Sequence, residues 1–191
     1  MSNITVKPFG SLPEGRKVQL YTLTNSKGTS LSICTYGGHV QSLKKKDAHG
    51  HLVDVVLGYD DAAVYVQDTK FIGALIGRCG NRIARGQLHI NGQEYQLECN
   101  NGRNHLHGGT WTGFHKKLWQ AEATADGLKL TYTSPDGEGN YPGTLQVTVW
   151  YDLSDEDAFS IRYEAVSDAD TICNLTNHTY FNLDGYDSGD V

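Results

Sequence analysis

The amino-acid sequence predicts an all-β protein, folded as an antiparallel sandwich or barrel. Several segments alternate apolar and polar residues with the two-residue period of a strand that has one buried face. Glycine accounts for 22 of the 191 residues and falls mostly between these segments, where turns are required. Helical periodicity is scarce. The length is typical of one domain, so we expect residues 1–191 to form a single domain.

The elements follow in chain order from this pattern. The predicted strands are residues 18–23, 31–36, 87–90, 94–97, 128–133, 145–153 and 159–165. The first two flank a turn at 25–28, and residues 60–66 are the one short stretch that favours a helix. Asn91-Gly92 separates the third and fourth strands and predicts a two-residue hairpin, because both residues tolerate positive φ. The last three strands alternate most regularly.

The charge and the apolar runs argue against two classes of partner. The net charge is −6 and the isoelectric point is near 5.7, whereas nucleic-acid binders carry a basic surface. The one basic run, Lys44-Lys45-Lys46, is typical of a solvated turn. No apolar run approaches the ~20 residues that span a bilayer. We therefore expect neither a nucleic-acid partner nor a membrane partner.

The four cysteines lie far apart and include no C-x-x-C pair. They are Cys34, Cys79, Cys99 and Cys173. This spacing does not predict a zinc cluster. The first ten residues contain no apolar signal region, which favours reduced cysteines and a cytoplasmic location.

Residues 174–183 (NLTNHTYFNL) form an unusual segment without formal charge at neutral pH. On a regular strand, one face would carry Asn174, Thr176, His178, Tyr180 and Asn182. Solvent-facing strands usually carry Lys, Glu or Arg, and this face carries none. Uncharged donors and acceptors beside an aromatic ring suit a polyhydroxylated, uncharged ligand. His178 is also the side-chain type best suited to proton transfer near neutral pH.

Residues 77–86 (GRCGNRIARG) place three arginines among glycines. The segment lacks the Lys-Ser/Thr ending of a P-loop. Two interpretations remain open. Glycines let the backbone approach a ligand whose oxygens the arginines bind. Alternatively, the segment is a bend in which Arg78, Arg82 and Arg85 pair with Asp or Glu.

Two other polar segments are weaker candidates for chemistry. His105 and His107 would share one face of a strand, a spacing that can bind a metal, but only His115 offers a third ligand nearby. We therefore expect a polar loop beside a pocket and no metal site. Asp136 and Glu138 lie among turn residues, and we expect them to be solvated rather than to form an acid/base pair.

An ordered set of motifs resembles the aldose 1-epimerase family. The motifs are Tyr36-Gly37-Gly38, Val56-Leu57-Gly58-Tyr59, Gly77-Arg78 with Asn81-Arg82-Ile83-Ala84, Asn91-Gly92, Leu106-His107-Gly108-Gly109, Gly139 with Tyr141-Pro142-Gly143, and residues 174–183. Each motif is weak alone, but together they extend over nearly the whole chain. The resemblance implies a large antiparallel β-sandwich with an open cleft on one sheet. It also implies interconversion of the α and β anomers of an aldohexose, such as galactose or glucose, without a cofactor.

The resemblance implies a role for five residues. His178 corresponds to the general acid of the family, and Asn81, Arg82 and His107 correspond to sugar-binding positions. Tyr180 falls beside the acid on the same predicted face and is expected to line the site. Ring opening requires a proton at the ring oxygen and loss of the anomeric proton, so an acid and a base must lie on different sides of the sugar. His105 departs from the family pattern, and we leave it out of the site.

The resemblance also implies that part of the site is missing from these 191 residues. In the family, the general base is a glutamate near the end of a considerably longer chain, and an aspartate contacts the sugar. No carboxylate here corresponds to either. We therefore expect an incomplete sandwich with exposed strand edges, which is unstable, aggregation-prone or completed by another polypeptide. We also expect negligible mutarotase activity from this chain alone.

Two alternative functions remain open from the sequence. The first is a non-catalytic carbohydrate-binding protein that keeps part of the cleft. The second is a hexose-phosphate 1-epimerase, which Arg78, Arg82 and Arg85 make conceivable.

Overall fold

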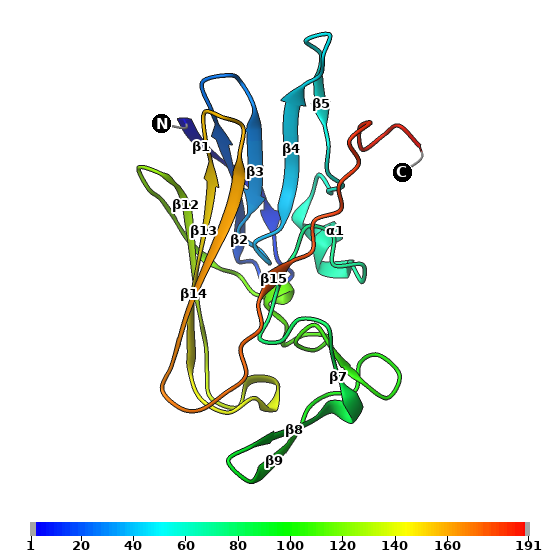
Figure 1. Ribbon diagram of the computed structural model, residues 1–191, viewed down its shortest axis with the longest axis vertical. Helices are drawn as coiled ribbons and strands as arrows, with labels where there is room; N and C mark the ends of the chain where they lie inside the picture. The colour runs from blue at the N-terminus through cyan, green and yellow to red at the C-terminus, as the bar shows by residue number, and fades with distance from the viewer. Residues whose placement is uncertain (1–2, 190–191) are drawn as a thin grey trace.

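Two antiparallel sheets face each other in the computed structural model, which describes residues 3–189 (Figure 1). One sheet has five strands in sequential order: β1 (Asn3–Ser11), β2 (Lys17–Thr24), β3 (Ser30–Cys34), β4 (Val40–Lys46) and β5 (Leu52–Asp54). The other has four: β11 (Gln120–Ala123), β12 (Gly127–Ser134), β13 (Leu145–Leu153) and β14 (Phe159–Ser167). The predicted all-β sandwich is confirmed.

The main core lies between the two sheets, and strand alternation builds it. In β13 every second residue is buried, beginning with Leu145 and ending with Leu153. The buried side chains of this core include Leu23, Leu31, Ile33 and Val40 from one sheet and Leu128, Leu130, Val147, Val149 and Tyr151 from the other. Burying each such side chain contributes roughly 1.5–3 kcal/mol. The sandwich is therefore stabilised mainly by the strands whose alternation is visible in the sequence.

The structure confirms the predicted helix and hairpin. The helix α1 (Ala62–Gln67) begins after Asp61, whose carboxylate accepts a hydrogen bond from the amide of Ala63. The hairpin joins β8 (Gln87–Ile90) to β9 (Gln93–Gln96). At its turn Asn91 and Gly92 have φ of 52° and 78°. No helix among residues 3–189 has the length and apolar character needed to cross a bilayer.

Four strands of the two large sheets, β1, β4, β5 and β11, were not predicted, and one prediction for their residues was wrong. β1, β5 and β11 bury few side chains, so their sequences lack clean alternation. Residues 44–46, expected to be a solvated turn, are the exposed end of β4 and pair with β5. Their lysines point to solvent, but their backbone belongs to the sheet. Charge alone therefore did not distinguish a turn from a strand end.

Residues 174–183 do not form the regular strand that their alternation suggested. Only β15 (Thr176–Asn177) forms a ladder, with β6 (Leu75–Ile76). The side-chain oxygen of Asn177 accepts a hydrogen bond from the amide of Thr179 at 2.9 Å, and its amide group donates to the carbonyl of Gly73. Such a local bond competes with a continuing ladder. The segment is extended but irregular.

Arg78 is a structural residue, only 2% exposed. Its guanidinium donates to the hydroxyl and the carbonyl of Ser134 and to the carbonyls of Pro135 and Pro142, at 2.9–3.0 Å. This matches the interpretation of a structural bend, but the partners are mostly backbone carbonyls rather than carboxylates. Arg78 thus holds together the turns that follow β12.

Glu138 corrects another expectation, because its carboxylate is largely buried instead of solvated. It accepts hydrogen bonds from Lys117, Tyr132 and Ser134 at 2.5–2.9 Å. Asp136 is exposed, as expected, and accepts from the amide of Gly143. The turn sequence did not show that one of the two carboxylates faces a neighbouring strand.

Candidate functional site

The backbone of β6 fixes the position of His178. β15 (Thr176–Asn177) pairs with β6 (Leu75–Ile76), and the contact continues one residue further. The amide of His178 donates to the carbonyl of Ala74 at 2.8 Å, and its carbonyl accepts from the amide of Gly73 at 3.1 Å. His178 is thus anchored by its backbone, and its side chain remains available for other contacts.

Asn81 and His107 hold each other through two hydrogen bonds. They flank a second short ladder, in which β7 (Arg82–Ile83) pairs with β10 (His105–Leu106). The amide of His107 donates to the carbonyl of Asn81 at 3.1 Å, and the amide of Asn81 donates to Nδ1 of His107 at 3.0 Å. Both residues have left-handed backbones, with φ of 60° and 53°. Such conformations occur often at functional sites.

The rings of His107, His178 and Tyr180 lie together. The imidazoles of His107 and His178 are perpendicular, with centroids 5.2 Å apart. The ring of Tyr180 lies 5.1 Å from that of His178. Phe71 adjoins both imidazoles, with its centroid 4.8 Å from His107 and 5.7 Å from His178. Residues from three distant parts of the sequence therefore form one cluster of rings.

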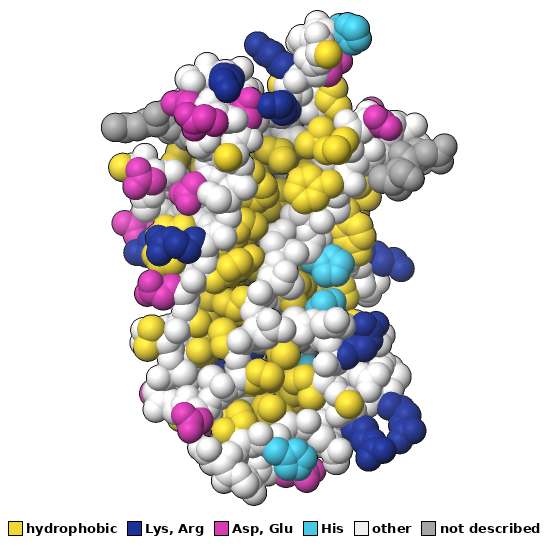
Figure 2. Space-filling view, in the orientation of Figure 1, with side chains coloured by type: hydrophobic (Ala, Val, Ile, Leu, Met, Phe, Trp, Pro, Cys, Tyr) yellow, Lys and Arg dark blue, Asp and Glu magenta, His cyan; other side chains and the backbone are white. Residues whose placement is uncertain are grey.

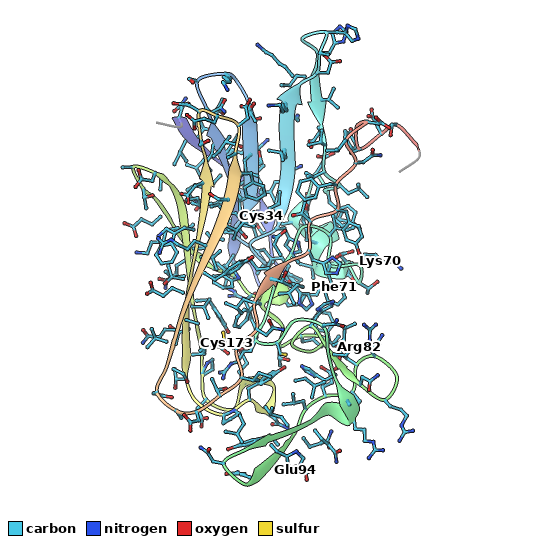
Figure 3. All side chains as sticks on the ribbon, viewed as in Figure 1. Cys34, Lys70, Phe71, Arg82, Glu94 and Cys173 are labelled. Carbon is cyan, nitrogen blue, oxygen red and sulfur yellow. The ribbon has the colours of Figure 1, made fainter. Side chains whose placement is uncertain are left out.

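Arg82 joins this cluster through Asn81. Its Nη1 donates to Oδ1 of Asn81 at 3.1 Å, and its Nε donates to Oδ1 of Asn101 at 2.9 Å. Figure 3 shows Arg82, the first residue of β7, on the same side of the molecule as Phe71. The Arg82 side chain is exposed, so its remaining N–H groups can reach a ligand.

The surroundings of His107 determine which of its nitrogens carries the proton. Nδ1 accepts from the amide of Asn81, so the neutral ring carries its hydrogen on Nε2. Burial lowers the pKa of His107 to about 4, and the nearby charges of His178 and Arg82 lower it further in the same direction. Near neutral pH, His107 is therefore a neutral hydrogen-bond donor through Nε2.

His178 and Tyr180 differ in how their polar atoms are used. Within residues 3–189, no side-chain hydrogen bond of the His178 imidazole is found, and the ring is half-buried. The hydroxyl of Tyr180 donates to the carbonyl of Lys70 at 3.0 Å. Tyr180 thus offers a ring face, whereas His178 offers an imidazole whose nitrogens no side chain of the described residues engages in a hydrogen bond.

Phe71 and Asn101 belong to this cluster but were not found from the sequence. Phe71 opens a mostly apolar run that continues with Ile72 and residues 74–76, so no alternation distinguishes it from its neighbours. Asn101 lies in the run Asn-Asn-Gly-Arg-Asn, where nothing distinguishes it from its neighbours. Both are recognised only through contacts between distant segments.

His105 is a core residue, in line with its omission from the site. It is fully buried, its Nδ1 lies 2.7 Å from the carbonyl oxygen of Glu98, and its Nε2 lies 2.7 Å from the hydroxyl of Tyr141. It does not share a strand face with His107, because the left-handed backbone of His107 ends the strand. In the described part of the chain, no group of three His, Cys, Asp or Glu side chains could hold a metal ion.

A groove of about 340 Å³ adjoins the ring cluster. Its walls include Phe71, Asn101, Leu106, Trp111 and His115. A separate hollow of about 350 Å³ lies over the five-stranded sheet. The five predicted site residues line neither the groove nor this hollow, but the groove includes Phe71, whose ring contacts His107 and His178. Residue chemistry therefore places the candidate site at the ring cluster and not at that second hollow.

Comparison with known proteins gives a consistent result. A family model described as aldose 1-epimerase matches residues 19–190. Galactose mutarotase of Bos taurus is 40% identical over 191 residues, which cover 100% of this chain and 55% of that protein. Aldose 1-epimerase of Escherichia coli strain K12 is 37% identical over 177 residues, which cover 92% of this chain and 51% of that protein. The chain thus spans about half the length of the curated relatives it matches.

Solved structures agree with the fold. The galactose 1-epimerase of Lactobacillus acidophilus NCFM superposes with a TM-score of 0.82 at 29% identity, over 96% of this chain and 54% of that one. The GalM/aldose epimerase homologue of C. elegans also superposes with a TM-score of 0.82, at 27% identity, over 97% of this chain and 52% of that one.

Proposed function

Because this chain belongs to the aldose 1-epimerase family, we propose that it carries the proton-donating side of a site that interconverts the α and β anomers of an aldohexose such as galactose or glucose. One observation carries the proposal. The imidazole of His178 has no side-chain hydrogen bond within residues 3–189 and lies 5.2 Å from a second imidazole, that of His107, which stays neutral near pH 7. Two histidines that differ in their hydrogen bonding suit two different tasks.

In the proposed reaction, His178 is the general acid. Its imidazolium gives a proton to the ring oxygen of the sugar while the bond between that oxygen and C1 breaks. A base takes the proton of the anomeric hydroxyl, and C1 becomes an aldehyde carbon. Rotation about the C1–C2 bond presents the other face, and the reverse proton transfers close the ring. No atom is gained or lost overall.

The neighbouring residues hold the sugar. Nε2 of His107 and the free N–H groups of Arg82 donate to sugar oxygens, and the Arg82 charge stabilises negative charge that develops there. The amide group of Asn81 lies beside Arg82 and offers further hydrogen bonds. The ring of Tyr180 lines the site beside the acid. An uncharged polyhydroxylated ligand uses all of these groups.

We assign no general base in this chain. Among residues 3–189, no carboxylate forms a hydrogen bond or an ion pair with His178, His107 or Arg82. We therefore expect the 191-residue chain to bind the sugar and, by itself, to leave the anomerisation rate close to that of buffer.

A small external carboxylate can replace the missing base, so the proposed role of His178 as the acid can be tested in this chain. Polarimetry would follow fresh α-galactose with the chain, with sodium acetate, and with both. We expect the chain and acetate together to exceed the sum of their separate rates. His178→Asn should abolish this excess, because no acid remains. His89→Asn, on the exposed hairpin, is the matched control and should retain it.

The opposite results would contradict the proposal. If the chain neither binds galactose nor shows an acetate-dependent excess rate, the proposed function is wrong. If His178→Asn retains the excess, His178 is not the acid. A rate well above buffer without acetate would mean that a base within the chain was overlooked.

A non-catalytic carbohydrate-binding protein is the second candidate, favoured by the absence of a carboxylate contact at the site within residues 3–189. It predicts galactose affinity that survives His178→Asn, with no acetate-dependent rate.

The hexose-phosphate alternative is less well supported, because the buried Arg78 guanidinium already donates hydrogen bonds to the backbone carbonyls of Pro135 and Pro142. Comparing binding of galactose and galactose 6-phosphate separates the two substrates.

We also propose that the protein acts in the cytoplasm. All four cysteines lie within the described residues and are free thiols, which suits a reducing compartment.

A further inference from the structure

We propose that Phe71 is a positioning residue of this site: its ring fills the space between the imidazoles of His107, His178 and His115 and fixes the orientation of the two that face the sugar. For its chemistry this proposal rests on the proposed function, and the experiment below separates the failure of one from the failure of the other.

The ring contacts carry the proposal. The Phe71 ring lies 4.8 Å from His107 and 4.8 Å from His115, at interplanar angles of 68° and 71°. It lies 5.7 Å from His178 at 36°. Edge-to-face pairs have a preferred geometry, because the positive edge of one ring meets the negative face of the other. One phenyl ring is therefore in edge-to-face contact with His107 and His115, and it also packs against His178 in a tilted contact.

The backbone presents this ring in an unusual way. Phe71 has φ of 60°, a left-handed conformation that bulky residues rarely adopt. The conformation is held from both sides. The carbonyl of Phe71 accepts from the amide of Ala74 at 3.1 Å, and the carbonyl of Lys70 accepts from the hydroxyl of Tyr180 at 3.0 Å. Tyr180, itself a predicted site residue, thus anchors the segment that carries Phe71.

Phe71 also supplies the apolar side of the His107 environment. The charged or titratable groups around His107 are His178, Arg82 and, beyond Phe71, His115. Burial is the main reason that the pKa of His107 is about 4. A phenyl ring in edge contact keeps water from that side of the imidazole, while Asn81 fixes its Nδ1. Removing the phenyl ring would both hydrate His107 and free its orientation.

The test is an NMR titration of the imidazole signals in the full chain, assigned with single His→Gln variants. In the wild type we expect the pKa of His107 near 4. Phe71→Ala should raise it by roughly one unit or more toward its usual value. Phe71→Tyr keeps the ring and should restore the wild-type titration to within about 0.3 units. Tyr186→Ala removes an exposed aromatic residue that lines the separate hollow over the five-stranded sheet, and it is the matched control.

Galactose affinity is the second measurement, followed by the shift of the same imidazole signals. We expect Phe71→Ala to weaken binding about tenfold, since mispositioned donors lose part of their hydrogen bonding. Phe71→Tyr and Tyr186→Ala should bind galactose as the wild type does.

The proposal is overturned if folded Phe71→Ala leaves both the His107 pKa and the galactose affinity unchanged. If Phe71→Ala does not fold, Phe71→Leu decides, because leucine keeps apolar volume but loses the flat ring. A wild-type chain that binds no galactose, together with a raised His107 pKa in Phe71→Ala, would overturn the proposed function and support the positioning role of Phe71.

Discussion

At the scale of single residues, His39 shows how burial can override hydrogen bonding. The ring is 1% exposed, and its two nitrogens lie 2.6 Å from the carbonyl oxygen of Ile72 and 3.3 Å from that of His115. Two carbonyl acceptors favour the imidazolium form. Burial nevertheless dominates and lowers the pKa of His39 to about 4. His39 is therefore neutral in the folded chain at every pH near neutrality.

This buried histidine makes the folded state sensitive to mild acid. The unfolded chain binds a proton at His39 near pH 6.5, whereas the folded chain does so only near pH 4. The stabilising contribution is therefore complete above pH 6.5 and is lost as the pH falls toward 4, at about 1.4 kcal/mol per unit. His39→Asn, which keeps a donor for Ile72, should reduce the slope of unfolding free energy against pH.

Urea unfolding at several pH values between 4 and 7 measures that slope. His49→Asn, in an exposed turn, is the control and should keep it. Equal slopes for wild type and His39→Asn would show that His39 does not cause the acid sensitivity.

The sequence predicted the polar residues of the candidate site better than Phe71, the apolar residue that packs against them. Asn81, Arg82, His107, His178 and Tyr180 were selected from their types and motifs, and the structure brings them together. Their roles toward a sugar stay predictions. Phe71 could not be selected, because its importance depends on a left-handed backbone and on contacts with distant segments.

At the scale of elements, two glycines are required for different reasons, one for its backbone conformation and the other for the lack of space for a side chain. Gly92, in the turn of the β8–β9 hairpin, has φ of 78° and open space where a Cβ would lie. Gly58 has no such φ, but a Cβ there would lie 1.9 Å from the carbonyl oxygen of Gln41 in β4. The same substitution therefore tests a different physical cause at each position.

Gly92→Ala should destabilise the chain by about 1 kcal/mol, the strain of a left-handed alanine. Gly58→Ala should cost more, roughly 3 kcal/mol or above, because the backbone of β4 or of residue 58 has to move. The midpoints of urea unfolding measure both. If Gly58→Ala proves the milder substitution, the close approach of residue 58 to β4 is not maintained in solution.

The sequence also predicted long elements better than short ones. β13 and β14 have nine residues each. Burial alternates along the whole of β13 and along β14 as far as Tyr163, which the alternation of apolar residues reports directly. β6, β7, β10 and β15 have two residues each, too few for any period. Their ladders depend on tertiary contacts that no local pattern encodes. The short ladders position the candidate site, so its surroundings were the least predictable part of the fold.

At the scale of the whole molecule, apolar side chains remain exposed beside the sandwich. Figure 2 shows hydrophobic side chains gathered on the face between the two sheets. The large exposed hydrophobic residues include Leu52, Val166, Phe181, Leu183 and Tyr186, each more than half exposed. β5 and β14 are edge strands of their sheets. Open edges and apolar surface favour association with other chains.

We therefore expect the 191-residue chain to bind a hydrophobic dye such as ANS and to self-associate at micromolar concentration. Val166→Lys should reduce association severalfold, since a lysine on edge strand β14 opposes strand pairing. Val64→Lys, on helix α1, is the control and should not. Sedimentation velocity measures the association. A monomer that unfolds cooperatively and binds no dye would contradict this expectation.

The two-residue ladders around His178 and His107 have a kinetic consequence. Free energies of local opening follow the number of buried contacts and backbone hydrogen bonds that must break, and few must break at β15 and β7. The candidate site should therefore fluctuate open many times for each global unfolding of the long strands. A sugar that bridges His178, His107 and Arg82 would link the two ladders, so occupancy would slow amide exchange at both and leave the centre of the sandwich almost unaffected.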